Sequence, residues 1–94
     1  MFRPMKRYVI EREIPGVGKM NREQLKNVAV TSCEALARLY GKAQWEHSYI
    51  TGDKTFCVYL ADCEESIREH ARLSGFPANK ITEALTIVDP MTAS

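Results

Sequence analysis

Residues 45–49 and 54–60 hold the side chains best suited to chemistry. The first segment reads Trp-Glu-His-Ser-Tyr and the second reads Lys-Thr-Phe-Cys-Val-Tyr-Leu, and a Gly-Asp pair lies between them. Together they carry an imidazole, a carboxylate, a thiol and two phenols. Imidazole suits zinc, copper and nickel, and a thiolate is a softer donor for such metals. The spacing predicts a surface that binds a divalent transition metal or a small ligand.

Four side chains are our candidate metal donors. His47 and His70 offer imidazole, Glu11 offers a carboxylate and Cys57 offers a soft sulfur donor. Two roles that need no metal stay open for these residues. A core histidine is often held by a hydrogen bond to a carbonyl group, and a carboxylate inside a covered sheet can pair with an arginine such as Arg12 instead of a metal.

The pairing of the two segments decides which side chains share a face. If Ile50 pairs with Thr55, then Trp45, His47 and Tyr49 lie on one face of the hairpin. In this register we expect the imidazole of His47 to face the second helix and to lie close to the imidazole of His70 on that helix. A single bulge near the turn would exchange the faces.

A ligand pocket is expected beside the metal donors. Trp45 and Tyr49 from the first segment and Tyr59 from the second would provide its rings and phenols. The alternative is a dimeric α+β barrel enzyme that encloses a small organic substrate, with His47 as acid or base. An enclosed cavity that holds this imidazole and a phenol would favour the enzyme.

The periodicity of apolar residues predicts a βαββαβ order. Asn21 and Gln24 form a capping box that opens the first helix, Gly41 stops it, and Asp62 with Glu65 repeats the capping pattern before the second helix. The predicted strands and helices are strands 5–14, 43–51, 54–61 and 81–88 and helices 22–40 and 63–74. This order builds a ferredoxin-like α+β fold, in which a four-stranded antiparallel sheet carries both helices on one face. The bare face predicts a homodimer of the α+β barrel type.

Length and composition predict a single domain at 5–90 with short flexible ends at 1–4 and 91–94. The net charge of +1 and the interleaved acids and bases disfavour nucleic acid as a partner. No apolar stretch is long enough to span a bilayer or to resemble a secretory signal, so we expect no membrane partner and a cytoplasmic location. Three cysteines without C-x-x-C spacing predict free thiols.

No motif in the chain specifies catalysis. Gly16-Val17-Gly18 lacks the third glycine of a dinucleotide site, and residues 54–61 lack the stacking rings of an RNA-recognition motif. No Ser-His-Asp pattern or phosphate loop is present. We therefore expect a binding protein more than an enzyme. A third alternative is a small-ligand sensor with its site at a subunit interface near Gly16 and Gly18.

Several segments together resemble one bacterial family. They are Trp45-x-His-Ser-Tyr49, Lys54-Thr-x-Cys-Val-Tyr59, Glu65-x-Ile-Arg-x-His-Ala71, Gly75-x-Pro77 and Val88-Asp-Pro90. The set is similar to a domain-of-unknown-function family of small ferredoxin-like proteins, one member of which is described as a nickel-binding protein. The resemblance runs from about residue 5 to residue 90. It implies the ferredoxin-like fold, dimers and, through that member, nickel as a bound metal.

Overall fold

The structure is a computed structural model that describes residues 4–94, so most of the predicted flexible end 1–4 lies outside the described residues. Four strands and two α-helices follow one another in the predicted βαββαβ order. Their bounds are β1 Lys6–Glu13, α1 Arg22–Ala37, β2 Ala43–Ile50, β3 Lys54–Ala61, α2 Glu64–Ser74 and β4 Lys80–Ala84. A short 3-10 helix, η1 at Val17–Lys19, follows β1. A second one, η2, lies near the end of the chain at Pro90–Ala93.

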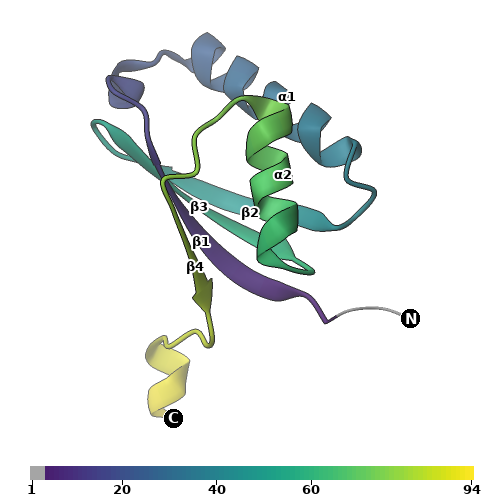
Figure 1. Cartoon of the computed structure of the whole chain (residues 1–94). Helices are drawn as coiled ribbons and strands as arrows, with labels where there is room; N and C mark the ends of the chain where they lie inside the picture. The colour runs from purple at the N-terminus through teal and green to yellow at the C-terminus, as the bar shows by residue number, and fades with distance from the viewer. Residues whose placement is uncertain (1–3) are drawn as a thin grey trace.

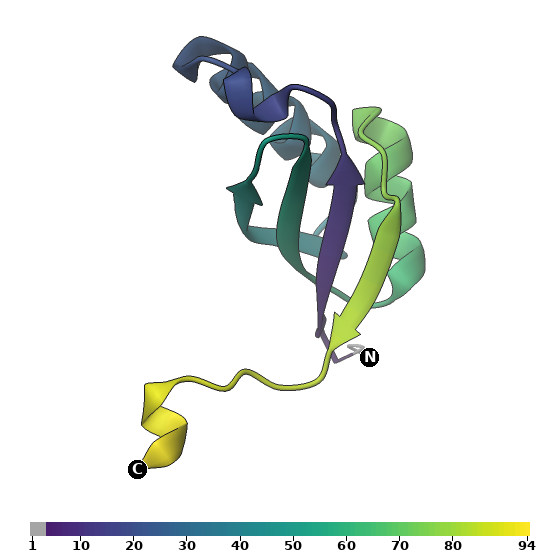
Figure 2. The ribbon, with the colours of Figure 1, turned by 90° about the vertical axis from the view of Figure 1, so that its left-hand side faces the viewer.

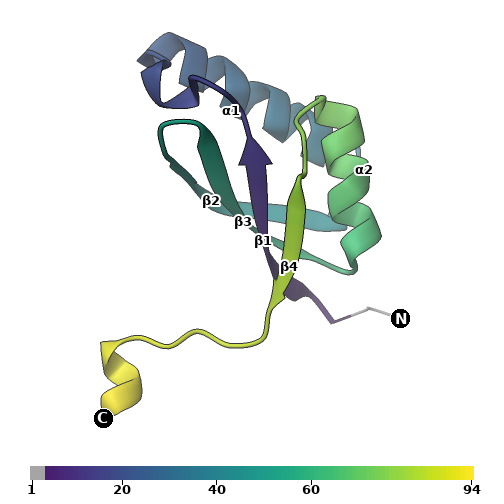
Figure 3. The same cartoon turned by 60° about the vertical axis from the view of Figure 1, so that its left-hand side comes forward.

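The sheet has the strand order β2-β3-β1-β4, and each neighbouring pair is antiparallel. Figure 1 shows α1 and α2 on the same side of this sheet, and Figure 3 shows the four strands side by side beneath them. Among the residues that the structure describes, no helix covers the opposite side of the sheet. The predicted ferredoxin-like α+β fold is therefore confirmed.

The core lies between the sheet and the two helices. Alternation along β1 turns Tyr8 and Ile10 inward, and alternation along β3 does the same for Cys57 and Tyr59. Ile67 of α2 packs onto these strands and is 1% exposed. The same period turns every second residue of β1 and β3 toward the open face.

The helices differ from the prediction at their ends. The Asn21 capping box that opens α1 is present, but the helix ends at Ala37 and the chain turns through Tyr40 and Gly41, both with positive φ. Helix α2 begins at Glu64, and its N-cap residue makes no side-chain cap bond. The N-cap is Cys63 and not the predicted Asp62, so the predicted position of the cap is wrong by one residue.

The last strand is shorter than predicted. Strand β4 ends at Ala84, which pairs with Arg7 at the beginning of β1, so the partner strand offers almost no further backbone groups. The rest of the predicted strand, 85–88, therefore leaves the sheet, and Leu85 is 88% exposed. Figure 2 shows this segment leading away from the sheet to η2.

A bulge in β2 places Trp45 and His47 on opposite faces of the sheet. Ile50 pairs with Thr55 as predicted, but the register shifts between Trp45 and His47. Trp45 therefore lies opposite Tyr59 on the helix side, whereas His47 stays on the open side. The prediction that residues 45 and 47 share a face is wrong, and so is the prediction that the imidazole of residue 47 faces α2.

Candidate functional site

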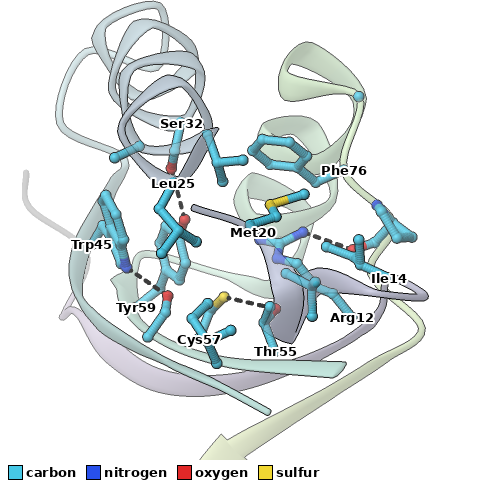
Figure 4. Close-up of a pocket in the computed structure, with 17 residues that line it drawn as sticks. Arg12, Ile14, Met20, Leu25, Ser32, Trp45, Thr55, Cys57, Tyr59 and Phe76 are labelled. Atoms are coloured by element: carbon cyan, nitrogen blue, oxygen red, sulfur yellow. Dashed lines mark hydrogen bonds between the residues drawn. The ribbon is translucent and has the colours of Figure 1, made fainter. Parts of the chain in front are cut away.

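A cavity of about 450 Å³ lies between α1 and the sheet. Figure 4 shows its lining side chains, which come from β1, β2, β3, α1, the η1 segment and the loop after α2. The lining residues are Arg12, Ile14, Val17, Met20, Leu25, Val28, Ala29, Ser32, Trp45, Ser48, Ile50, Thr55, Cys57, Tyr59, Gly75, Phe76 and Pro77. Most of these side chains are apolar, and this volume falls in the range of small-molecule sites.

The cavity exists because α1 does not pack tightly on the sheet. Leu25, Val28 and Ala29 project from the inward side of α1 but are only half-buried, since they line the cavity. Only Ser32 and Ala35 of this helix are fully buried. Helix α2 shows the opposite behaviour, because its inward residues pack directly onto β1 and β3.

Arg12 is the one charged residue among those that line the cavity. It is 2% exposed because its position in β1 follows Tyr8 and Ile10 on the helix side. Its Nη1 donates to the Pro77 carbonyl oxygen at 2.8 Å, and its guanidinium carbon lies 5.9 Å from the Tyr59 ring centre. Within residues 4–94, its buried Nη2 has no hydrogen-bond partner and no carboxylate lies within ion-pair distance of it.

A chain of buried polar groups connects the cavity wall to α2. The Tyr59 hydroxyl lies 3.0 Å from Ser32 Oγ, which lies 3.2 Å from Nε2 of His70. That nitrogen is also 3.4 Å from the Ser32 carbonyl oxygen, which can only accept, so Nε2 carries the proton. Burial and the charge of Arg12 lower the pKa of His70 to about 4, against the opposing bond to Ser32. The imidazole is therefore neutral at pH 7.

The phenol of Tyr59 stays protonated on the same wall. Its burial raises the pKa of the Tyr59 hydroxyl, although the Ser32 bond and the charge of Arg12 oppose this effect. Beside it, the Trp45 indole donates to Ser48 Oγ at 2.9 Å, which fixes the tryptophan ring against the cavity. These hydroxyl and indole groups have partners, whereas one guanidinium nitrogen does not.

The four predicted metal donors do not come together in one chain. Glu11 and His47 belong to the open side of the sheet, and Cys57 and His70 are buried on the helix side. The carboxylate of Glu11 lies near two lysines, with its Oε1 3.9 Å from Lys54 Nζ and its Oε2 4.0 Å from Lys80 Nζ. Within residues 4–94, no three His, Cys, Asp or Glu side chains are grouped closely enough to hold a metal ion. The expected convergence of the two imidazoles is therefore wrong.

Two of the three predicted pocket residues line the cavity. Trp45 and Tyr59 do so, and their rings stack with centres 6.4 Å apart. Tyr49 does not, because it pairs with Phe56 on the open side and is 62% exposed. Its ring meets His47 edge-on at 5.1 Å instead.

The glycine pair after β1 anchors a loop. Gly18 donates its backbone N–H to the Gly52 carbonyl oxygen at 3.0 Å, and Gly16 donates its own to Asp53 Oδ1 at 2.9 Å. A Cβ on residue 18 would lie 2.6 Å from the carbonyl oxygen of Thr51. Both glycines therefore hold η1, which closes one end of the cavity, against the β2–β3 turn.

The residue that sequence reasoning missed is Arg12. The sequence suggested it only as a partner for a carboxylate, yet it is the buried cation of the cavity. A signal was available, because the alternation of Tyr8, Ile10 and Arg12 places all three on one face of β1. No sequence pattern indicated that α1 would leave a cavity between itself and the sheet.

Comparison with known proteins gives two matches. The model of the family described as "Nickel responsive protein SCO4226-like" matches residues 8–84. The crystal structure of SCO4226 from Streptomyces coelicolor A3(2) is similar, with a TM-score of 0.71 and 14% sequence identity over 87% of this chain and 99% of that one. At this identity the likeness shows the fold alone. No curated protein matches the sequence.

No helix within residues 4–94 has the length and apolar character needed to cross a membrane.

Proposed function

We propose that this chain, which belongs to the family of SCO4226-like nickel-responsive proteins, binds a small organic ligand in the cavity beneath α1. The observation that carries the proposal is the 450 Å³ apolar space, since protein interiors are otherwise close-packed. A binding role accounts for the half-buried inward face of α1 without requiring any reactive group.

A fluorescence titration tests the proposal. N-phenyl-1-naphthylamine, a neutral apolar dye, should bind with a rise in emission and should alter the emission of Trp45, the single tryptophan of the chain. The variant Ala29→Leu adds three carbon atoms that narrow the cavity from α1, and it should weaken dye binding strongly. Ala35→Leu is the matched control on the same helix, because Ala35 is buried away from the cavity.

The two alanine variants should also differ in stability. Ala29→Leu adds methyl groups to empty space, so its free energy of unfolding should be equal to or above that of the original protein. Ala35→Leu adds them to a packed site and should cost about 1–3 kcal/mol, measured by urea unfolding. Dye binding by Ala29→Leu with unchanged affinity would contradict the proposal.

The enzyme alternative needs its acid or base in the cavity, on the helix side of the sheet. It requires His47 beside a phenol in the cavity, but His47 pairs with Val58 on the open side of the sheet. The imidazole on the helix side is that of His70, whose pKa is about 4 and whose Nε2 is engaged by Ser32. A general base that works near neutral pH needs a pKa closer to 7. Binding is therefore the function that the cavity supports.

Nickel binding is the second candidate function. The family description favours it, together with the exposure of His47, which leaves an imidazole open to a metal. Since no group of three donors is present within residues 4–94, the remaining ligands would come from a second copy or from solvent. Calorimetric titration of nickel into tag-free, chelator-stripped protein tests this role.

Two histidine variants make the nickel experiment specific. His47→Ala should remove the heat of nickel binding, and His70→Ala should keep it, because His70 is fully buried. Unchanged nickel binding in His47→Ala would exclude this residue as a ligand. The loss of heat only in His70→Ala would contradict the proposal as well.

We also propose that two copies associate through the open face of the sheet. Val9 and Val58 face each other across β1 and β3 there, and Phe56 and Leu60 lie on the same side, all four half-exposed in one chain. Burial of such apolar area drives association. Light scattering should give the mass of a dimer for the original protein and of a monomer for Val58→Asp. A monomer in both would contradict the proposal.

A further inference from the structure

From the buried, unpartnered guanidinium of Arg12 we infer that the ligand of the cavity is a small organic acid, with one carboxylate on an apolar body. The carboxylate would pair with Nη2 of Arg12, and the apolar body would lie along Leu25 and Val28 of α1. This inference rests on the proposed function and adds the chemical class of the ligand.

The first step of the argument is the cost of the charge. Arg12 is 2% exposed and carries the positive charge of a guanidinium, and a buried charge is costly unless it is paired. Its bond to the Pro77 carbonyl oxygen satisfies Nη1 but provides no counter-charge. Glu11 and Glu13, its neighbours in β1, alternate to the other face of the sheet. An anion from outside the chain is the missing counter-charge.

The second step is the direction of the free donor. Figure 4 shows the guanidinium end of Arg12 among the cavity side chains, beneath Met20. The Tyr59 ring lies on one side of the guanidinium, with 5.9 Å between the guanidinium carbon and the ring centre. Arg12 therefore belongs to the cavity wall and holds its one unpaired donor, Nη2, in a buried position where a small side-chain movement would bring it to a ligand. A guanidinium is well suited to a carboxylate.

The third step limits the charge and the size of the ligand. The lining residues include one cation and no acid, so a single negative charge is matched and a phosphate dianion is not. The hydroxyls of Ser32 and Tyr59 already bond each other, which leaves few donors for extra oxygens. At about 30 Å³ for a water-sized group, the 450 Å³ volume holds on the order of 15 non-hydrogen atoms.

The test compares three eight-carbon probes of the same length. Octanoate, 1-octanol and octylamine are titrated separately into the protein at pH 7.5, with Trp45 emission and calorimetry as readouts. A charge-assisted hydrogen bond predicts that octanoate binds at least about tenfold more tightly than 1-octanol, and that octylamine binds most weakly. In Arg12→Met the ratio of octanoate to 1-octanol affinity should fall to about one, whereas Arg12→Lys should retain a preference for octanoate.

The outcomes separate this inference from the proposed function. If none of the probes and no neutral dye binds, the proposed function fails and the inference fails with it. If 1-octanol binds as tightly as octanoate, or if Arg12→Met keeps the preference, the cavity is a binding site but the acid is not its ligand. Should Arg12→Met not fold, as judged by circular dichroism, the same ratio in Arg12→Gln decides between these results.

Discussion

Acidification should destabilise this fold through His70. The imidazole is fully buried, and burial together with the charge of Arg12 lowers its pKa from the ordinary 6.5 to about 4. The unfolded chain therefore binds a proton at a higher pH than the folded chain does. The stability that the neutral imidazole provides is complete above pH 6.5 and is lost as the pH falls toward 4.

The size of the effect follows from these two values. Between pH 7.5 and pH 5, a single group with a pKa of 6.5 when unfolded and about 4 when folded lowers the free energy of unfolding by about 2 kcal/mol. The full difference, reached below pH 4, is about 3 kcal/mol at 1.36 kcal/mol for each pKa unit. For a domain of this size that is a large part of the total stability.

Urea unfolding at pH 5 and pH 7.5 measures the effect. In His70→Gln the fall in stability between the two pH values should be about 2 kcal/mol smaller than in the original protein, because glutamine does not titrate. Ile67→Val is the matched control, since it loosens the same face of α2 without changing a titratable group and should leave the pH dependence unchanged. Equal pH dependence in His70→Gln and the original protein would refute the reasoning.

Three further predictions concern single side chains. Arg12→Met should raise the pKa of His70, because it removes the second cause of the shift, and proton NMR of the imidazole measures it; an unchanged pKa would contradict the assigned role of this charge. Gly18→Ala should cost about 1–3 kcal/mol in urea unfolding, since its Cβ would lie 2.6 Å from a backbone oxygen, whereas Gly52→Ala meets nothing within 4 Å and should be nearly neutral. Asn21→Ala should cost about 1 kcal/mol in the same assay through loss of the capping box, and an unchanged midpoint would contradict that role.

The fold could be predicted because local signals and packing agree. The Asn21–Gln24 box and the alternation in β1 and β3 indicated the same βαββαβ order that the structure shows. The end of β4 could not be predicted in this way. Residues 85–88 have strand-forming side chains, but a strand also needs a partner, and the pairing with β1 ends at Arg7.

The site was predicted only in part, and one backbone irregularity explains much of the difference. Trp45 and Tyr59 were expected in a pocket, and both line the cavity. The bulge between Trp45 and His47 places these two residues on opposite faces, because one extra residue in a strand reverses the alternation. The turn at Gly52 suggested a bulge there, but nothing in the sequence placed one at Glu46.

The open face and the cavity divide the predicted chemistry of the chain between two places. His47 and Tyr49 lie on the open face, where the proposed nickel and subunit contacts would form. Arg12 lies in the cavity, where the proposed organic acid would bind. The sequence placed His47 and Tyr49 in the hairpin but expected His47 on the helix side, so it did not indicate the open face. The sequence predicted a pocket with Trp45 and Tyr59, but the place of Arg12 in it became visible only with the position of α1 above the sheet.

An NMR titration tests the central claim, that the cavity beneath α1 is a ligand site, most directly. Addition of N-phenyl-1-naphthylamine to ¹⁵N-labelled protein should shift the amide signals of Ala29, Ser32 and Thr55, which lie on the two walls of the cavity. Signals of the open face away from the cavity, such as that of Val9, should stay in place. Shifts confined to that face, or no shifts at all, would contradict the claim.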